Sequence, residues 1–238
     1  MPTPAAVTRS VYQLRVVLHG VSPLIWRRLL VPGDASVADV HAVLQIVFGW
    51  DGEHLHRFVI HGVEYGIGYA GGVGFRDDPH RIHLADLGLR PTERFVYHYD
   101  FTAGWRLDLR LEQILAAEGG RVYPRCTGGR RAGPAEGCGG PRAFTEYTQP
   151  HLVFDAVLRA AALLQPLLDD DLATPADHRE ELAALLPLLG LERFDRRAVN
   201  RALAGLTEKY GSRRSKGGWR EGHRAGRGRR RRRADRSP

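Results

Sequence analysis

Residues 48–58 hold the densest group of side chains that could do chemistry, because a helical pattern ends there and a strand pattern begins. If the second half of this segment is extended, alternate side chains share a face, so His54, His56 and Phe58 point to one side. Two imidazoles two residues apart can converge on one ligand. They can equally be half-buried structural side chains, and the sequence leaves both interpretations open.

Other polar and aromatic residues extend this group into a candidate pocket. A second strand pattern places His98 and Asp100 on one face and tyrosines on the other. The predicted pocket comprises Trp50, His54, His56, His98, Asp100 and Trp105. No catalytic residue is assigned within it, and no serine before residue 212 lies in a Gly-x-Ser-x-Gly elbow.

The two cysteines raise the alternative of a metal site. Thiolates together with imidazoles suit zinc at a tetrahedral site, which gives a proposed ligand set of Cys126, Cys138, His54 and His56. Eleven residues separate the cysteines and no Cys-x-x-Cys pair is present, so the spacing is not specific for zinc. If a metal activates water there, the protein is a metal-dependent hydrolase using a His/Asp/Cys site.

The elements that must position these side chains are a set of strands and one helix. Alternating apolar residues predict strands at residues 12–20, 24–31, 55–60, 94–101 and 105–111. Ser36 and Asp39 form a capping box that starts a helix, which Gly49 ends. The aromatic face of residues 95–101 is expected to pack in the core under this helix, although exposed rings on a sheet can also stack on bases.

The second half of the chain lacks the strand patterns of the first half. Residues 124–141 are predicted to be an irregular loop because Gly, Pro and Arg dominate them, and the apolar spacing beyond Phe144 is helical. Strands followed by helices indicate an α+β fold. We expect an N-terminal mixed or antiparallel sheet packed by one main helix and followed by C-terminal helices.

Composition predicts a folded cytoplasmic protein with a basic tail. The 238 residues are 43% apolar, and neither a signal peptide nor a run long enough to cross a membrane is visible. Residues 211–238 carry eleven Arg and one Lys against one Glu and one Asp, so of the net charge of +8 this tail contributes +10 and the remainder −2. The tail is predicted to be disordered and to bind nucleic acid through Arg229, Arg230, Arg231, Arg232 and Arg233. GC-rich coding is an equally good explanation of its arginines.

Several separated motifs together resemble the plasmid pRiA4b ORF-3-like proteins, which also occur as TnpR-type passenger proteins of insertion elements. The motifs are Ser22-Pro-Leu-Ile-Trp-Arg-Arg28, His41-x-x-x-Gln45-x-x-Phe-Gly-Trp50, His54-Leu-His56-x-Phe58, Tyr99-Asp-Phe101, Tyr123-Pro-x-Cys126 and Cys138-Gly-Gly140. The resemblance covers residues 11–206, within which residues 149–174 are predicted to be an inserted helix.

The resemblance implies one α+β domain and a role near transposition. It favours a non-enzymatic binding or accessory protein of mobile elements that contacts nucleic acid, and it identifies no protein partner. The family pattern often has a further Cys where this chain has Gly133 and a His where it has Leu107. If relatives bind a metal there, this chain has lost candidate ligands.

Overall fold

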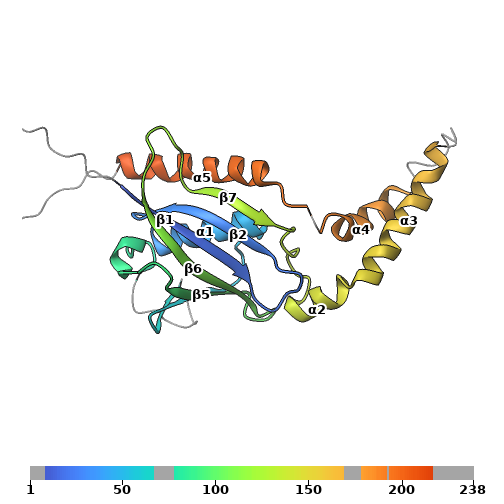
Figure 1. The fold of residues 1–238 in the computed structure, drawn as a ribbon, viewed down its shortest axis with the longest axis horizontal. Coiled ribbons are helices and arrows are strands. Elements are labelled where there is room, and N and C mark those ends of the chain that lie inside the picture. The colour runs from blue at the N-terminus through green and yellow to red at the C-terminus, as the bar shows by residue number, and fades with distance from the viewer. Residues whose placement is uncertain (1–8, 67–77, 169–177, 192, 217–238) are drawn as a thin grey trace, which may run out of the picture.

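The body of the protein is one antiparallel sheet of seven strands (Figure 1). The computed structural model describes residues 9–66, 78–168, 178–191 and 193–216. The strands are β1 Ser10–Leu18, β2 Trp26–Pro32, β3 His56–Ile60, β4 Val63–Gly66, β5 Arg94–Tyr99, β6 Trp105–Ala116 and β7 Arg125–Arg130. Their order across the sheet is β4-β3-β5-β6-β1-β2-β7. The predicted hairpins, β1 with β2 and β5 with β6, are confirmed.

The main helix, α1 (Val37–Phe48), packs on one face of this sheet and lies behind it in Figure 1. Its predicted capping box is present, because Asp39 N donates to Ser36 Oγ at 3.1 Å and Ser36 N donates to the Asp39 carboxylate at 2.8 Å. Gly49 ends the helix at φ +78°, a left-handed conformation that costs glycine little.

Alternation along the central residues of the strands divides the sheet into a buried and an open face. On β6, Trp105, Leu107, Leu109 and Leu111 are buried, whereas the residues between them are charged. On β5 the buried residues are Phe95, Tyr97 and Tyr99, so the aromatic face is core as predicted, while Phe101 beyond the strand is 46% exposed. The open face is therefore the one that α1 does not cover.

The remaining elements are helical, and the α+β prediction is confirmed. They are a short 3-10 turn at Leu84–Leu87, α2 Gly140–Tyr147, α3 Pro150–Leu168, α4 Arg179–Leu189 and α5 Arg196–Lys216. α3 and α4 pack on each other and project from the sheet (Figure 1), whereas α5 contacts β7 and α1. Within the described residues, no helix combines the length and the apolar content that crossing a membrane requires.

Two predictions about the second half are wrong. Residues 125–130 are not irregular but form β7, because backbone pairing with β2 needs no alternating side chains. α5 continues to Lys216, so the start of the predicted tail is helical. Arg229–Arg233, predicted to contact nucleic acid, lie outside the described residues.

Candidate functional site

A buried polar cluster lies where α1 crosses β3 and β5. The rings of His41 on α1 and His56 on β3 stack with centroids 3.6 Å apart and planes 10° from parallel. The hydroxyl of Tyr97 on β5 lies 2.8 Å from His41 Nδ1, and Gln45 Nε2 donates to the same hydroxyl at 2.7 Å. One phenol thus ties two consecutive turns of the helix to the sheet.

Burial sets the charge state of this cluster. It lowers the pKa of His41 to about 3, helped by the neighbouring His56, and it lowers the pKa of His56 to about 4. Burial also raises the pKa of Tyr97 well above its usual value. All three groups are therefore neutral near pH 7. His56 Nδ1 and Gln45 Oε1 are buried without a hydrogen-bond partner among the described residues.

A second, more exposed group lies beside the first at the end of β5. Tyr99 Oη is 2.7 Å from Glu136 Oε1 and 3.3 Å from Asp51 Oδ1, and it accepts a hydrogen bond from Gly52 N at 3.2 Å. His54 Nε2 lies 3.6 Å from Glu136 Oε1. Burial, reinforced by the hydrogen bond to Glu136, raises the pKa of Tyr99. The phenol therefore stays protonated and acts as a link to carboxylates.

Trp50 joins the two groups to the loop that follows β7. Its indole stacks on Phe48 and on Tyr99, with centroids 5.2 and 4.9 Å away, and lies 6.0 Å from Trp105. Trp50 Nε1 donates to the carbonyl of Pro134 at 3.2 Å. The loop carrying Pro134 and Glu136 is thus fixed against the end of α1.

The structure gathers most of the predicted pocket but separates His98 from it. Trp50, His54, His56 and Trp105 surround the two tyrosines, whereas His98 lies on the open face between Arg57 and Arg106. Asp100 does not share the face of His98, because β5 ends at Tyr99 and Asp100 has φ +48°. Its carboxylate caps the turn, accepting from Thr102 N and Ala103 N at 3.1 Å each, and lies 3.9 Å from His54 Nδ1.

The proposed metal ligands do not come together. Across the described residues, no group of three or more His, Cys, Asp or Glu side chains is placed to hold a metal ion. Cys126 lies on β7, with four strands between it and His56 on β3. Its thiol contacts the Gly128 carbonyl at 3.2 Å, and burial raises the pKa of both cysteines. Cys138 is partly buried against the core, so both cysteines pack as core side chains.

Sequence reasoning missed five residues of the cluster: His41, Gln45, Tyr97, Tyr99 and Glu136. A signal for two of them was present, since His41 and Gln45 are one helical turn apart and so share a face of α1. The tyrosines were read only as core side chains. Nothing in the sequence indicated Glu136, which reaches the cluster through the path of a loop.

The open face of the sheet carries a second candidate site made of arginines. Arg28 on β2 faces Arg15 on β1, Arg15 faces Arg110 on β6, and Arg110 faces Arg94 on β5. Strands lie about 4.8 Å apart, so this row of four arginines, here called the upper row, spans about 14 Å. Like charges placed directly opposite destabilise a sheet. Anions bound to the row would therefore stabilise it by neutralising the arginines.

Carboxylates of the protein neutralise only part of the positive charge on the open face. In its described rows, it holds eight arginines, namely Arg15, Arg28, Arg57, Arg94, Arg106, Arg110, Arg125 and Arg130. Glu112, Glu64 and Asp108 pair with Arg28, Arg57 and Arg106 respectively. Eight cations against three anions leave this face with a net charge of +5.

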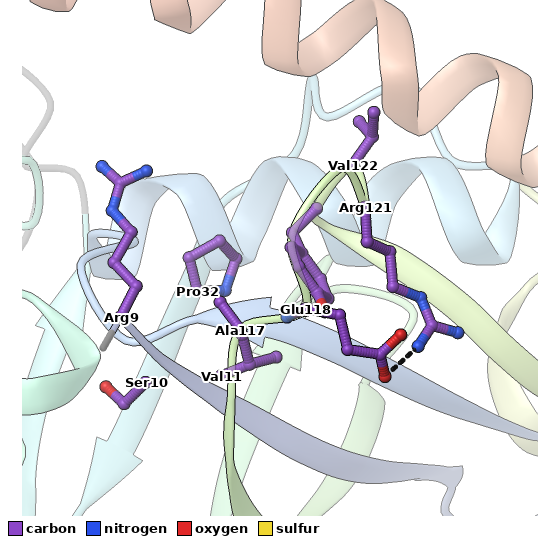
Figure 2. A pocket seen from close by; sticks show the side chains of 9 residues that line it. Arg9, Ser10, Val11, Pro32, Ala117, Glu118, Arg121 and Val122 are labelled. Carbon is purple, nitrogen blue, oxygen red and sulfur yellow. Dashed lines mark hydrogen bonds and ion pairs between the residues drawn. The ribbon is translucent and has the colours of Figure 1, made fainter. Parts of the chain in front are cut away.

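A cavity of about 410 Å³ opens elsewhere, beside the start of β1 and the loop after β6 (Figure 2). None of the predicted pocket residues lines it. Its charged side chains are already paired, Arg121 with Glu118 and Arg9 with Asp34. It therefore offers no free charge for a ligand.

Comparisons with known proteins agree with this fold. Residues 10–151 match the model of the family described as plasmid pRiA4b ORF-3-like protein. The uncharacterized protein y4hQ of Sinorhizobium fredii is 32% identical over 146 residues, which are 59% of this chain and 72% of y4hQ. The crystal structure of MM3350 from Methanosarcina mazei Go1, a protein of unknown function, has a TM-score of 0.59 and 28% identity, covering 81% of this chain and 97% of that one.

Proposed function

The chain belongs to the plasmid pRiA4b ORF-3-like family, and from this we propose that it is a non-enzymatic accessory protein of mobile elements that binds nucleic acid. The mobile-element association rests on the family resemblance. The observation that supports nucleic-acid binding is the upper row, in which Arg28, Arg15, Arg110 and Arg94 oppose one another on the open face.

Phosphates are the anions that fit this row best. An extended polyanion places several charges along one line, and each guanidinium can donate two parallel hydrogen bonds to a phosphate. Within this row, Arg110 on β6 and Arg94 on β5 are exposed. Binding of this kind positions a nucleic acid without reading its sequence. The predicted tail arginines would add to the same electrostatic attraction.

The test changes the row without disturbing the core. Full-length protein with Arg15→Gln and Arg110→Gln is compared with wild type for binding to a fluorescent oligonucleotide over a series of salt concentrations. A matched control, Arg142→Gln with Arg197→Gln, removes the same charge from exposed positions on α2 and α5. Losing two phosphate contacts should weaken binding about tenfold. It should also reduce the salt slope, which is the steepness with which the logarithm of the binding constant falls with the logarithm of the salt concentration, by about two.

Folding and the tail are controlled separately. Removing opposed arginines relieves repulsion, so the double variant should be at least as stable as wild type in a thermal melt. Changing Arg229–Arg233 to Gln measures the contribution of the tail. If only that variant and not the row variant lost affinity, the face would have no part in binding. If neither variant lost affinity, nucleic-acid binding through these arginines would be wrong.

A further inference from the structure

A stripe of apolar side chains crosses the open face beside the upper row. Trp26 on β2 faces Val17 on β1, and Val96 on β5 faces Val59 on β3. Asp108 on β6 lies between the two halves, since it faces both Val17 and Val96. The four apolar side chains are only partly buried, although the outward face of an antiparallel sheet is usually polar.

A second basic row borders the stripe on its other side. This lower row consists of Arg106 on β6, His98 on β5 and Arg57 on β3, each paired directly with the next. Each basic row is two residues along the strands from the stripe, which is about 7 Å. Phe101, 46% exposed, adds an aromatic ring at this edge, with the Arg57 guanidinium 5.4 Å from its centroid.

The carboxylate of Asp108, in the middle of the stripe, is paired with neighbouring basic side chains. Asp108 turns toward the lower row, with Oδ1 2.8 Å from Arg106 Nε and Oδ2 3.1 Å from His19 Nδ1. From the upper row, the guanidinium groups of Arg15 and Arg28 lie 4.8 and 5.7 Å from the ring centroid of Trp26. Planar cationic and aromatic groups thus meet at one end of the stripe.

We infer that this face binds single-stranded nucleic acid, with bases on the stripe from Trp26 to Val59 and phosphates on the arginines of the two flanking rows. The inference rests on the proposed nucleic-acid function and names its substrate class. Unpaired bases stack on exposed rings and guanidinium planes, and such stacking tolerates any sequence. A duplex keeps its bases inside, and its major groove admits a helix or a two-stranded ribbon but not a broad sheet.

The experiment separates bases from phosphates. Three probes of equal length are used: a thymidine single strand, the same strand with abasic positions throughout, and a duplex. The protein is the full-length chain carrying Gln at positions 229–233, so that the tail does not mask the face. We expect the thymidine strand to bind at least about tenfold more tightly than the abasic strand, and more tightly than the duplex at matched salt.

Substitution of the ring gives the second readout. Trp26→Ala should bring thymidine binding close to abasic binding while leaving the salt slope unchanged, because no phosphate contact is lost. Arg15→Gln with Arg110→Gln should weaken both strands equally. The ratio of the affinities for the thymidine and abasic strands is measured on protein that keeps Trp26. It therefore decides the question even if the Trp26→Ala variant does not fold.

The outcomes distinguish the two proposals. Equal affinity for thymidine and abasic strands, with loss of both in the arginine variant, would overturn base contact by the stripe and leave the proposed function standing. Tighter binding of the duplex would also overturn the single-strand inference alone. Failure of all three probes to bind the chain with Gln at positions 229–233 would overturn binding by the open face, and failure of the wild-type chain to bind them as well would overturn the proposed function.

Discussion

At the scale of single residues, the least expected side chain is Arg27, which is buried at 1% exposure. It donates to the carbonyl oxygens of Val47, Trp26 and Arg130 at 2.9, 2.8 and 3.0 Å. Its guanidinium also lies 3.9 Å from the ring centroid of Phe194. Burial lowers the pKa of Arg27 to about 10, so the group stays charged at neutral pH and joins α1, β2 and β7.

Replacing Arg27 by lysine should therefore be costly although the charge is kept. A compact ammonium cannot reach three carbonyls as a planar fork does, and Arg27→Lys should lower the free energy of unfolding by about 2–4 kcal/mol. Urea denaturation measures this change. Arg15→Lys on the open face is the control and should change stability by less than about 0.5 kcal/mol. Equal stability of Arg27→Lys and wild type would contradict the joining role.

The stacked histidines predict acid sensitivity. Their folded-state pKa values of about 3 and about 4 lie below the ordinary 6.5, so the unfolded chain binds protons more readily. The contribution of the two neutral histidines to the free energy of unfolding is complete above pH 6.5. It decreases as the pH falls from there toward about 4. Between pH 7 and 5 the loss should be on the order of 1–2 kcal/mol per histidine.

Comparison of two variants isolates this effect. His56→Gln should flatten the dependence of unfolding free energy on pH between 7 and 5, because one titrating ring is removed. Gln113→Asn, which changes an exposed side chain that carries no titratable group, should leave the slope as in wild type. Were His56→Gln to keep the full slope, the low pKa assigned to the buried pair would be wrong.

At the scale of elements, the loop between β7 and α2 decides the shape of the polar cluster. A Cβ on Gly133 would lie 2.1 Å from the carbonyl oxygen of Phe48, so the loop touches the end of α1 with no room for a side chain. Any larger side chain at this position would require the loop to move. The same loop carries Glu136 to Tyr99.

Gly133→Ala should accordingly destabilise the protein by about 1–3 kcal/mol and weaken the link between Tyr99 and Glu136. Thermal unfolding gives the first quantity, and the near-ultraviolet circular dichroism of the aromatic cluster reports the second. Gly119→Ala adds the same methyl group where no atom lies within 4 Å and should be close to neutral. A Gly133→Ala protein as stable as Gly119→Ala would show that the loop adapts freely.

At the scale of the whole molecule, positive charge is concentrated rather than general. Outside residues 211–238 the net charge of the chain is −2, yet the open face carries +5. The acidic side chains therefore lie mainly on other surfaces, and a polyanion would be steered to one face of the sheet.

The projecting α3 and α4 expose Phe154 and Leu186 by 61% and 63% and extend beyond the residue 151 at which the family match ends.

Much of the fold was predictable because its signals are local. Alternating residues identified β1, β2, β5 and β6, and the Ser36 capping box with Gly49 located α1. The candidate site was predictable only in part. Trp50, His54, His56 and Trp105 were found by residue type, whereas His98 was misplaced because strand alternation was extended through Asp100, where the chain turns at positive φ.

The sequence by itself determined most of the elements, the family and the division of charge between body and tail, since local patterns, short motifs and composition carry these signals; β7, which lacks an alternating pattern, is the exception. Only the tertiary structure decided which side chains meet. The opposed arginines align because the register of β2, β1, β6 and β5 brings them together, including a shift at Gln13 and Leu14. Alternation decides only which face of the sheet a side chain takes. Which residues stand opposite one another across β1 and β6, as far apart in sequence as Arg15 and Arg110, is decided by long-range backbone pairing. For the same reason, Cys126 and the histidines were separated by four strands, and the His54 and His56 segment became one side of a cluster completed by α1 and a distant loop.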